Sequence, residues 1–238
     1  AEFGFYAIQY HDKTPQFYLY PGANVDPSIL KFGEYRLVYP GQAIRSYGVS
    51  VSTQVGDVNV SGEASVRRNT PLVSDPQFVA PTADNEGNAA YAIGNSAHLQ
   101  VSALYIVPPT ALWNSAVFLG EVAWNRRTSV TKNEAALAAN SSRDAWATRF
   151  VFTPTWYQVA GLLDLSLPVG VGYSAKGNSS VVGQFNPGGK DGGDLSIGVQ
   201  GVYQQVWRFG LNVTHFFGRE GTALNTAGQY SFKQYLKD

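Results

Sequence analysis

Several residue types and patterns are missing from this chain of 238 residues, and each absence narrows the choice of function. Cysteine is absent, which excludes disulfides, thiolate metal sites and cysteine nucleophiles. No run of 18 apolar residues occurs, so the sequence predicts no transmembrane helix. Charged residues make up only 14% of the chain, against about 25% in typical soluble domains. The formal net charge is zero, so we expect no nucleic-acid partner.

Methionine is also absent, and the chain begins at Ala1 with neither a start methionine nor a signal peptide. Residues 1–5 already have the composition of a strand, so we expect a processed chain or a piece of a longer one. Aromatic residues, by contrast, reach 13% of the chain, and there are 25 glycines. Few charges and many aromatic side chains fit a protein whose surface meets lipid.

Ten stretches have the composition of β-strands, and the links between them alternate strictly between long and short. The short links are tight, such as Gly56-Asp57. This asymmetry is typical of outer-membrane β-barrels, which have short periplasmic turns and long external loops. The predicted strands are 2–10, 44–55, 58–67, 95–107, 116–128, 144–157, 163–174, 194–205, 207–217 and 229–236. The long loops are predicted near 11–43, 68–94, 129–143, 175–193 and 218–228.

Apolar and polar residues alternate with a period of two within these stretches. Val49 and Val51 fall on one face, and Ser50 and Ser52 fall on the other. The alternation resumes after the Gly56-Asp57 link, which indicates a β-hairpin. A slip of one residue would place arginines in hydrocarbon, at about 2–4 kcal/mol each near the membrane midplane. We therefore expect one all-β domain over residues 1–238, folded as an antiparallel up-and-down transmembrane β-barrel of about ten strands, either complete or part of a larger barrel.

Charged residues within the predicted strands fall on the polar face. Two interpretations remain open at similar weight: a charged constriction that lines a lumen, and a salt-bridge network that fills it. The mixture of signs argues against a strongly ion-selective pore. The candidate lumen-lining residues are Glu63, Arg67, Glu121, Arg127, Arg149, Asp164 and Arg208.

Aromatic residues gather where the predicted strands end, which indicates two interfacial girdles. The alternative is that they form the core of a soluble β-protein. The residues near the short turns are Tyr105, Trp113, Trp156, Tyr157, Tyr203 and Trp207, and those near the long loops are Trp124, Trp146, Tyr173 and Phe217.

Signals for catalysis and for metal binding are weak. Ser96 and His98 lie two residues apart on one strand and so face the same way, but nothing marks either as activated for an outer-membrane hydrolase. A glycine-rich acidic loop carries Asn186, Asp191 and Asp194, which are weak candidates for calcium because that ion prefers several oxygen ligands. The sequence predicts no enzyme, no cofactor and no firm metal site.

Six stretches carry a resemblance to a known family. They are SYGVS at 46–50, GEASVRRNTPL at 62–72, FLGEVAWN at 118–125, FNPGG at 185–189, GGDLSIG at 192–198 and GQYSFKQYLKD at 228–238. They resemble the proteobacterial outer-membrane proteins grouped as domain of unknown function 1302, and the resemblance spans almost the whole chain. Members are about twice as long, and this chain is similar to their C-terminal portion.

The resemblance implies a location in the bacterial outer membrane and contact with its lipid. It also implies a role in transport, because such proteins are often encoded beside a second envelope protein and an inner-membrane exporter, in operons that concern hydrophobic or aromatic compounds. It supplies no catalytic residues. We expect a channel, or an export or uptake component, for small apolar or aromatic molecules. The alternatives are a non-transporting structural or assembly barrel that its own loops plug and, less favoured, an outer-membrane hydrolase.

Overall fold

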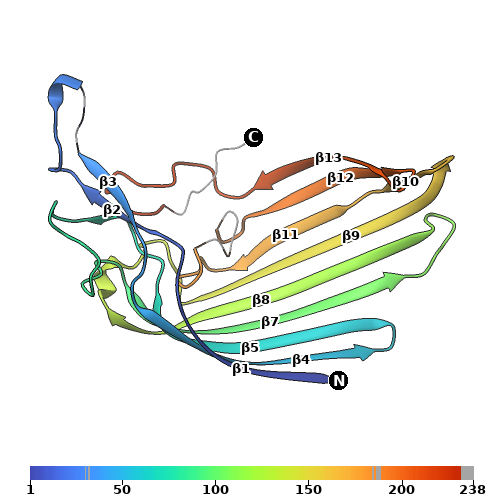
Figure 1. Ribbon diagram of the computed structural model, residues 1–238, viewed down its shortest axis with the longest axis horizontal. Coiled ribbons are helices and arrows are strands. Elements are labelled where there is room, and N and C mark those ends of the chain that lie inside the picture. The colour runs from blue at the N-terminus through green and yellow to red at the C-terminus, as the bar shows by residue number, and fades with distance from the viewer. Residues whose placement is uncertain (30, 32, 184, 186–188, 232–238) are drawn as a thin grey trace.

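A large antiparallel sheet dominates the computed structural model, which describes residues 1–29, 31, 33–183, 185 and 189–231. Ten strands form this sheet side by side in one layer, and the long loops gather at the end opposite the short turns (Figure 1). They are β1 (Glu2–His11), β4 (Ala43–Val55), β5 (Val58–Pro71), β7 (Ile93–Val107), β8 (Ser115–Lys132), β9 (Asp144–Ala160), β10 (Leu163–Ser166), β11 (Val169–Lys176), β12 (Gly193–Tyr203) and β13 (Trp207–Phe217).

The all-β prediction is confirmed, and so is the up-and-down order of the strands. Each strand of the large sheet pairs with the next one along the chain, except that β10 and β11 do not pair with each other and both lie between β9 and β12. The predicted hairpin at Gly56-Asp57 is present, with Gly56 in the left-handed region at φ 59°. Such a turn matches the right-handed twist of the two flanking strands.

The single strand predicted over 163–174 is wrong in one respect, because it is two strands separated by Leu167 and Pro168. Proline has no N–H to donate to a neighbouring strand, so the pairing stops there. The gap is still partly bonded, since the Leu167 N–H donates to the Pro154 carbonyl and the Gly198 N–H donates to the Pro168 carbonyl.

Two of the predicted long loops are more structured than the sequence indicated. Residues 11–43 contain β2 (Gln16–Tyr20), the 3-10 turn η1 (Pro27–Ile29) and β3 (Glu34–Val38), and residues 68–94 contain β6 (Gln77–Phe78). These strands form a second, three-stranded sheet in the order β3-β2-β6, in which β6 runs parallel to β2.

The strand predicted over 229–236 falls largely outside the described residues. Of its described part, only Tyr230 forms a bridge, and that bridge joins it to Leu224. The described residues contain one further 3-10 turn, η2 (Glu134–Ala136), and none of their helices is long and apolar enough to cross a membrane.

Most of the buried apolar side chains lie in the long loops, and those of the large sheet, such as Ile44 and Ile93, lie at the loop ends or turn ends of their strands. One cluster joins Tyr18 and Tyr20 of β2 to Tyr91, and a second joins Leu72 to Val181. We call this region of packed connections, at the long-loop end, the loop cap. The large sheet also leaves apolar side chains exposed on all its strands except the short β10, including Val49, Leu99, Ile197 and Leu211.

Candidate functional site: the polar face and the loop cap

The register of the large sheet brings polar side chains from distant parts of the chain together on one face. Ser50 of β4 lies opposite Glu63 of β5, which lies opposite Gln100 of β7. Side chains of a strand alternate between faces, so the residues two positions along share this face, and the apolar rows take the other. We call these the polar face and the apolar face.

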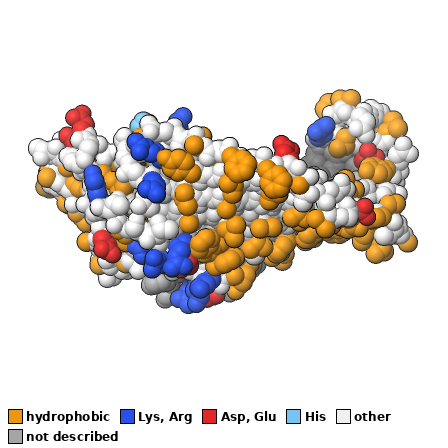
Figure 2. Space-filling view, turned by 90° about the horizontal axis from the view of Figure 1, so that it is seen from below, with side chains coloured by type: hydrophobic (Ala, Val, Ile, Leu, Met, Phe, Trp, Pro, Cys, Tyr) orange, Lys and Arg blue, Asp and Glu red, His pale blue; other side chains and the backbone are white. Residues whose placement is uncertain are grey.

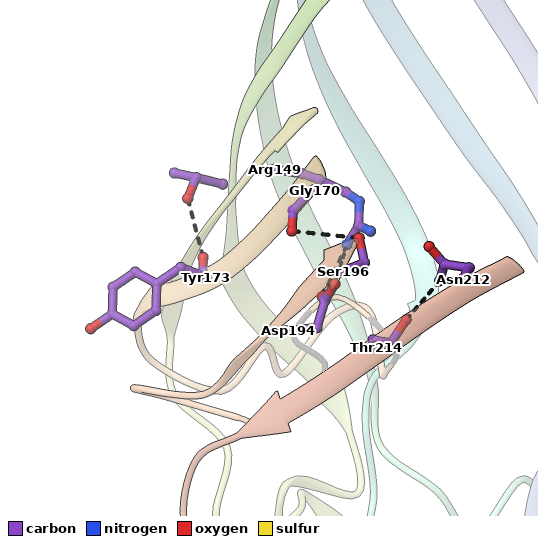
Figure 3. A network of polar contacts seen from close by, with 8 residues as sticks. Arg149, Gly170, Tyr173, Asp194, Ser196, Asn212 and Thr214 are labelled. Carbon is purple, nitrogen blue, oxygen red and sulfur yellow. Dashed lines mark hydrogen bonds and ion pairs between the residues drawn. The ribbon is translucent and has the colours of Figure 1, made fainter. Parts of the chain in front are cut away.

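One row of the polar face carries alternating charges across neighbouring strands. Glu121 lies opposite Arg149, Arg149 lies opposite Gly172, and Gly172 lies opposite Asp194. The Arg149 guanidinium reaches past Gly172 to Asp194, with Nη1 at 2.9 Å from Oδ1 and 3.1 Å from Oδ2 (Figure 3). The Asp194 side chain is only 5% exposed, so this ion pair supplies the positive charge that a buried carboxylate requires.

Gly172 makes this ion pair possible because it leaves the space between the two charged groups open. A Cβ at position 172 would stand 2.6 Å from Asp194 Oδ1 and 3.0 Å from Arg149 Nη1. Neither the role of Gly172 nor the partnership of Arg149 with Asp194 was evident from the sequence. The only signal was the alternation of Gly170 and Gly172 with apolar residues along β11.

The other acidic residues of this level also have partners on the polar face. The Tyr6 hydroxyl donates to Glu63 Oε1 at 2.7 Å, and Gln100 Nε2 donates to Glu121 Oε2 at 3.0 Å. Sequence reasoning missed both partners. Tyr6 can reach across β4 because its ring passes over Gly48, where a Cβ would collide with it.

The seven charged residues predicted to line a lumen lie at three levels along the sheet. Glu63, Glu121 and Arg149 lie at the middle level. Arg67 and Arg127 flank Ser96 near the loop cap. Asp164 and Arg208 lie at the short-turn end, where both are opposite Val202. Asp164 accepts hydrogen bonds from the Gln158 N–H at 2.9 Å and from Gln205 Nε2 at 3.0 Å, so it links the end of β9 to the turn between β12 and β13.

An apolar patch interrupts the polar face between the middle level and the short turns. Leu104 lies opposite Leu119, and Ile106 is two positions along from Leu104 on the same face. These side chains are 38%, 45% and 63% exposed for Leu104, Leu119 and Ile106. The polar face therefore offers both charged and apolar contacts to whatever lies against it.

The loop cap covers the polar face at the opposite end. Ser179 belongs to the connection after β11, and its hydroxyl donates to Asn125 Oδ1 of β8 at 2.7 Å. Asn178 Nδ2 donates to the Asn140 carbonyl at 3.0 Å, which ties that connection to the one after β8. As a result Asn125, Ser96 and Ser174 are almost fully buried although their strands carry them on the polar face.

Ser96 and His98 are within hydrogen-bond distance, with Ser96 Oγ 2.9 Å from His98 Nε2. Ser96 is only 1% exposed because it lies under the loop cap. Asn125, rather than a carboxylate, lies opposite His98. The pair therefore forms a partly buried polar contact whose serine is nearly inaccessible to solvent.

Of the weak calcium candidates, Asp191 and Asp194 each lie beside a cationic side chain. Arg149 binds both carboxylate oxygens of Asp194, and Asp191 Oδ2 is 3.6 Å from Lys190 Nζ. Asn186 lies outside the described residues. In the described ranges, no group of three or more His, Cys, Asp or Glu side chains lies close enough to hold a metal ion.

The aromatic residues flanking the strands form two rows on the apolar face. At the loop-cap end, Trp124 and Trp146 lie opposite each other with ring centroids 6.1 Å apart, and Tyr173 stacks on Phe217 at 6.4 Å. At the short-turn end of this face lie Tyr105, Trp113, Trp156, Tyr203 and Trp207, whereas Tyr157 directly follows Trp156 and so falls on the polar face. Trp113 and Trp156 there donate indole N–H bonds to the Pro108 and Leu112 carbonyls.

These features define an all-β protein whose antiparallel sheet has one polar face and one apolar face, with its long connections packed as a cap. Residues 1–237 match the model of the family described as protein of unknown function (DUF1302), so the chain belongs to that family. The family resemblance noted in the sequence is thereby confirmed. No curated protein and no solved structure gave a significant match.

Proposed function

We propose that the chain is an outer-membrane β-barrel, or a section of one, that carries small apolar or aromatic molecules across the membrane. The observation that supports this proposal most is the exposure of the apolar face. Phe5 is 80% exposed, Leu211 is 74% and Phe209 is 55%, and such side chains occur on every strand of the sheet except the short β10. Soluble monomers rarely expose a contiguous apolar surface of this extent, because water penalises it.

The spacing of the aromatic rows also supports a membrane location. On β9 the two rows are represented by Trp146 and Trp156, which are ten residues apart. Ten residues span about 33 Å of strand. At a tilt of about 40° that length corresponds to a band about 25 Å tall, the height of the apolar band of outer-membrane barrels.

The polar face supports passage of solutes, because it supplies the lining of a lumen when the sheet closes on itself or on further strands. The apolar patch at Leu104, Ile106 and Leu119 gives aromatic solutes a surface on that lining. Outer-membrane lipid is the expected surrounding. A periplasmic envelope protein and an inner-membrane exporter are the partners we propose.

The loop cap favours a second candidate, which is a structural barrel that passes nothing. It covers the polar face at one end and buries Ser96 and Asn125 there. In this alternative the charged residues hold the barrel open and the connections plug it.

Solute flux into liposomes separates the two candidates. We would reconstitute the purified chain and compare uptake of glucose with uptake of phenyl glucoside, which is larger but carries an aromatic ring. A transporter of aromatic solutes passes phenyl glucoside faster despite its size, and Leu104→Asn with Leu119→Asn removes that preference.

A loosened cap tests the plug directly. Ser179→Ala removes the hydrogen bond to Asn125, and we expect increased ion conductance in planar bilayers. Ser61→Ala removes the Ser61–Ser52 hydrogen bond of 3.1 Å, away from the cap, and serves as the control. A barrel that passes neither ions nor solutes, with the cap intact or loosened, would establish the structural alternative.

A further inference from the structure

Two arginines face each other on the apolar face at the end nearest the loop cap. Arg45 of β4 lies directly opposite Arg68 of β5, one position beyond the polar-face pair Ser46 and Arg67. Like charges directly opposite in an antiparallel pair repel each other, because their Cβ atoms are only about 4.5–5.5 Å apart. Both residues are exposed.

No carboxylate of the described residues forms an ion pair with either arginine. The contact found for Arg45 is a long hydrogen bond, 3.4 Å from its Nε to Gln9 Oε1. Within the part of the chain that the structure describes, no acidic side chain therefore compensates the repulsion between Arg45 and Arg68. An anion between the two guanidinium groups would relieve it, and phosphate suits the fork of N–H donors best.

A hollow of about 800 Å³ adjoins this arginine pair. Of its 13 lining residues, nine belong to the apolar face by strand register. Phe5, Tyr47 and Trp124 supply aromatic walls, while Ala64, Val66 and Ala97 leave the space between them open.

The arginine pair and the hollow form one continuous site. Tyr47 and Val66 line the hollow, and each is two residues from an arginine, which is about 7 Å along the strand. Figure 2 shows a side of the molecule on which apolar side chains run along the strands and several Lys and Arg side chains gather toward the left. An elongated apolar surface beside the two positive charges of Arg45 and Arg68 is complementary to a molecule with a phosphate at one end and a hydrocarbon chain at the other.

We propose that Arg45, Arg68 and the adjoining hollow bind a phosphorylated acyl lipid, with the phosphate on the two guanidinium groups and an acyl chain in the hollow. The inference rests on the proposed membrane location, which brings lipid to this face and keeps water-soluble partners away from it. It assigns a specific lipid site to a surface that would otherwise meet lipid only in bulk.

The test uses the full chain in an uncharged detergent, with dioleoyl phosphatidic acid as the probe and retained lipid measured by native mass spectrometry. We expect Arg45→Gln with Arg68→Gln to raise the Kd about tenfold or more, because two charge-assisted contacts are lost. Ala64→Phe fills the hollow from an exposed position and should raise the Kd to a similar degree without disturbing the fold. Arg208→Gln removes the same charge from the other face, at the far end of the sheet, and should leave the Kd unchanged.

Two further probes test whether binding needs both the phosphate and the acyl chains of the lipid. Dioleoylglycerol lacks the phosphate and inorganic phosphate lacks the chains, so each should bind at least about tenfold more weakly than phosphatidic acid. Equal competition by inorganic phosphate would reduce the site to an anion site and overturn the proposal. Unchanged affinity in both the arginine and the Ala64 variants would overturn it as well.

Membrane fractionation distinguishes failure of this inference from failure of the proposed function. Recovery of the wild-type chain in the soluble fraction would contradict both the proposed membrane function and the lipid site. Chain recovered in the outer membrane, yet without binding that depends on Arg45 and Arg68, would remove the lipid site alone.

Discussion

At the scale of single residues, the polar face depends on charges whose partners lie far away in the sequence. Arg149 and Asp194 are the clearest case, since the exposed arginine neutralises a carboxylate that is nearly inaccessible to water. Removing one member of such a pair costs more than the pair itself contributes, because the other charge stays buried and unpaired.

We therefore expect Arg149→Gln to lower the free energy of unfolding by about 1.5–3 kcal/mol, the range for a hydrogen bond to a charged group. The double variant with Asp194→Asn should lose less than the sum of the two single losses. Urea unfolding of the wild type, the two single variants and the double variant gives the interaction energy between Arg149 and Asp194. Strictly additive losses would mean that the ion pair contributes nothing.

The tyrosines of the loop cap are expected to make its stability depend on pH. Burial raises the pKa of Tyr18 and of Tyr91 above the usual value near 10. The folded cap therefore favours the protonated hydroxyls, so their contribution to stability is complete below pH 10 and falls as the pH rises through the raised pKa values.

Absorbance at 295 nm measures this titration, and near-UV circular dichroism reports the packing of the cap. We expect the near-UV signal to vanish only when Tyr18 and Tyr91 ionise, at a pH above the usual tyrosine pKa near 10. Tyr39→Phe, at an exposed position, serves as the control. Ionisation of all tyrosines in one step near pH 10, with packing retained, would contradict the prediction.

At the scale of the strand, neighbouring positions tolerate different residue types, because one side chain lies on the apolar face and the next lies on the polar face. Val101 of β7 is on the apolar face and Ser102 is on the polar face, opposite Val122 and Glu121. Arginine at Val101 would enter hydrocarbon in the proposed membrane orientation, at about 2–4 kcal/mol near the midplane.

We expect Val101→Arg to reduce the amount of folded protein in the outer membrane, while Ser102→Arg is tolerated. The measurement is the folded fraction after membrane isolation, from the mobility of unheated and heated samples in gels. Val101 is 46% exposed, so in water the substitution would be harmless. Equal yields of the two variants would therefore argue against bilayer contact.

At the scale of the whole molecule, β1 and β13 stand at opposite edges of the large sheet (Figure 1). Among the described residues, each pairs with a single neighbour, β4 for β1 and β12 for β13. Unpaired strand edges are costly in lipid, because each unbonded N–H and C=O group lacks water there.

In the membrane we therefore expect both edges to be paired, with each other or with further strands. Hydrogen exchange tests this prediction: amides of β1 and β13 should be protected as strongly as those of the central strand β5. The amides of β3, in the small sheet, provide the reference for an exposed edge. Fast exchange confined to the outward amides of β1 and β13 would show that the sheet stays open.

The sequence predicted the large sheet well because its information is local. The alternation of Val49, Ser50, Val51 and Ser52 has the period of a strand, and Gly56-Asp57 has the chemistry of a hairpin turn. These signals placed eight strands directly and assigned every described charged candidate within the strands to the polar face. They missed the break at Leu167 and Pro168, because the alternation on both sides of it predicted one continuous strand over 163–174.

The loop cap and the partners within the site could not be predicted in the same way. The small sheet joins residues near 18 to residues near 77, and Ser179 reaches Asn125 across 54 positions. No local pattern marks such contacts. They depend on how the long connections fold back onto a sheet that must already exist.

By itself, then, the sequence determined which residues form strands and which of their two faces is polar, since a period of two fixes the face of every side chain. Only the tertiary structure decided that Arg149 pairs with Asp194, that Ser96 is covered, and that Arg45 and Arg68 meet beside an apolar hollow. The physical reason is register: which side chains lie opposite each other depends on how whole strands align, and no segment carries that alignment alone.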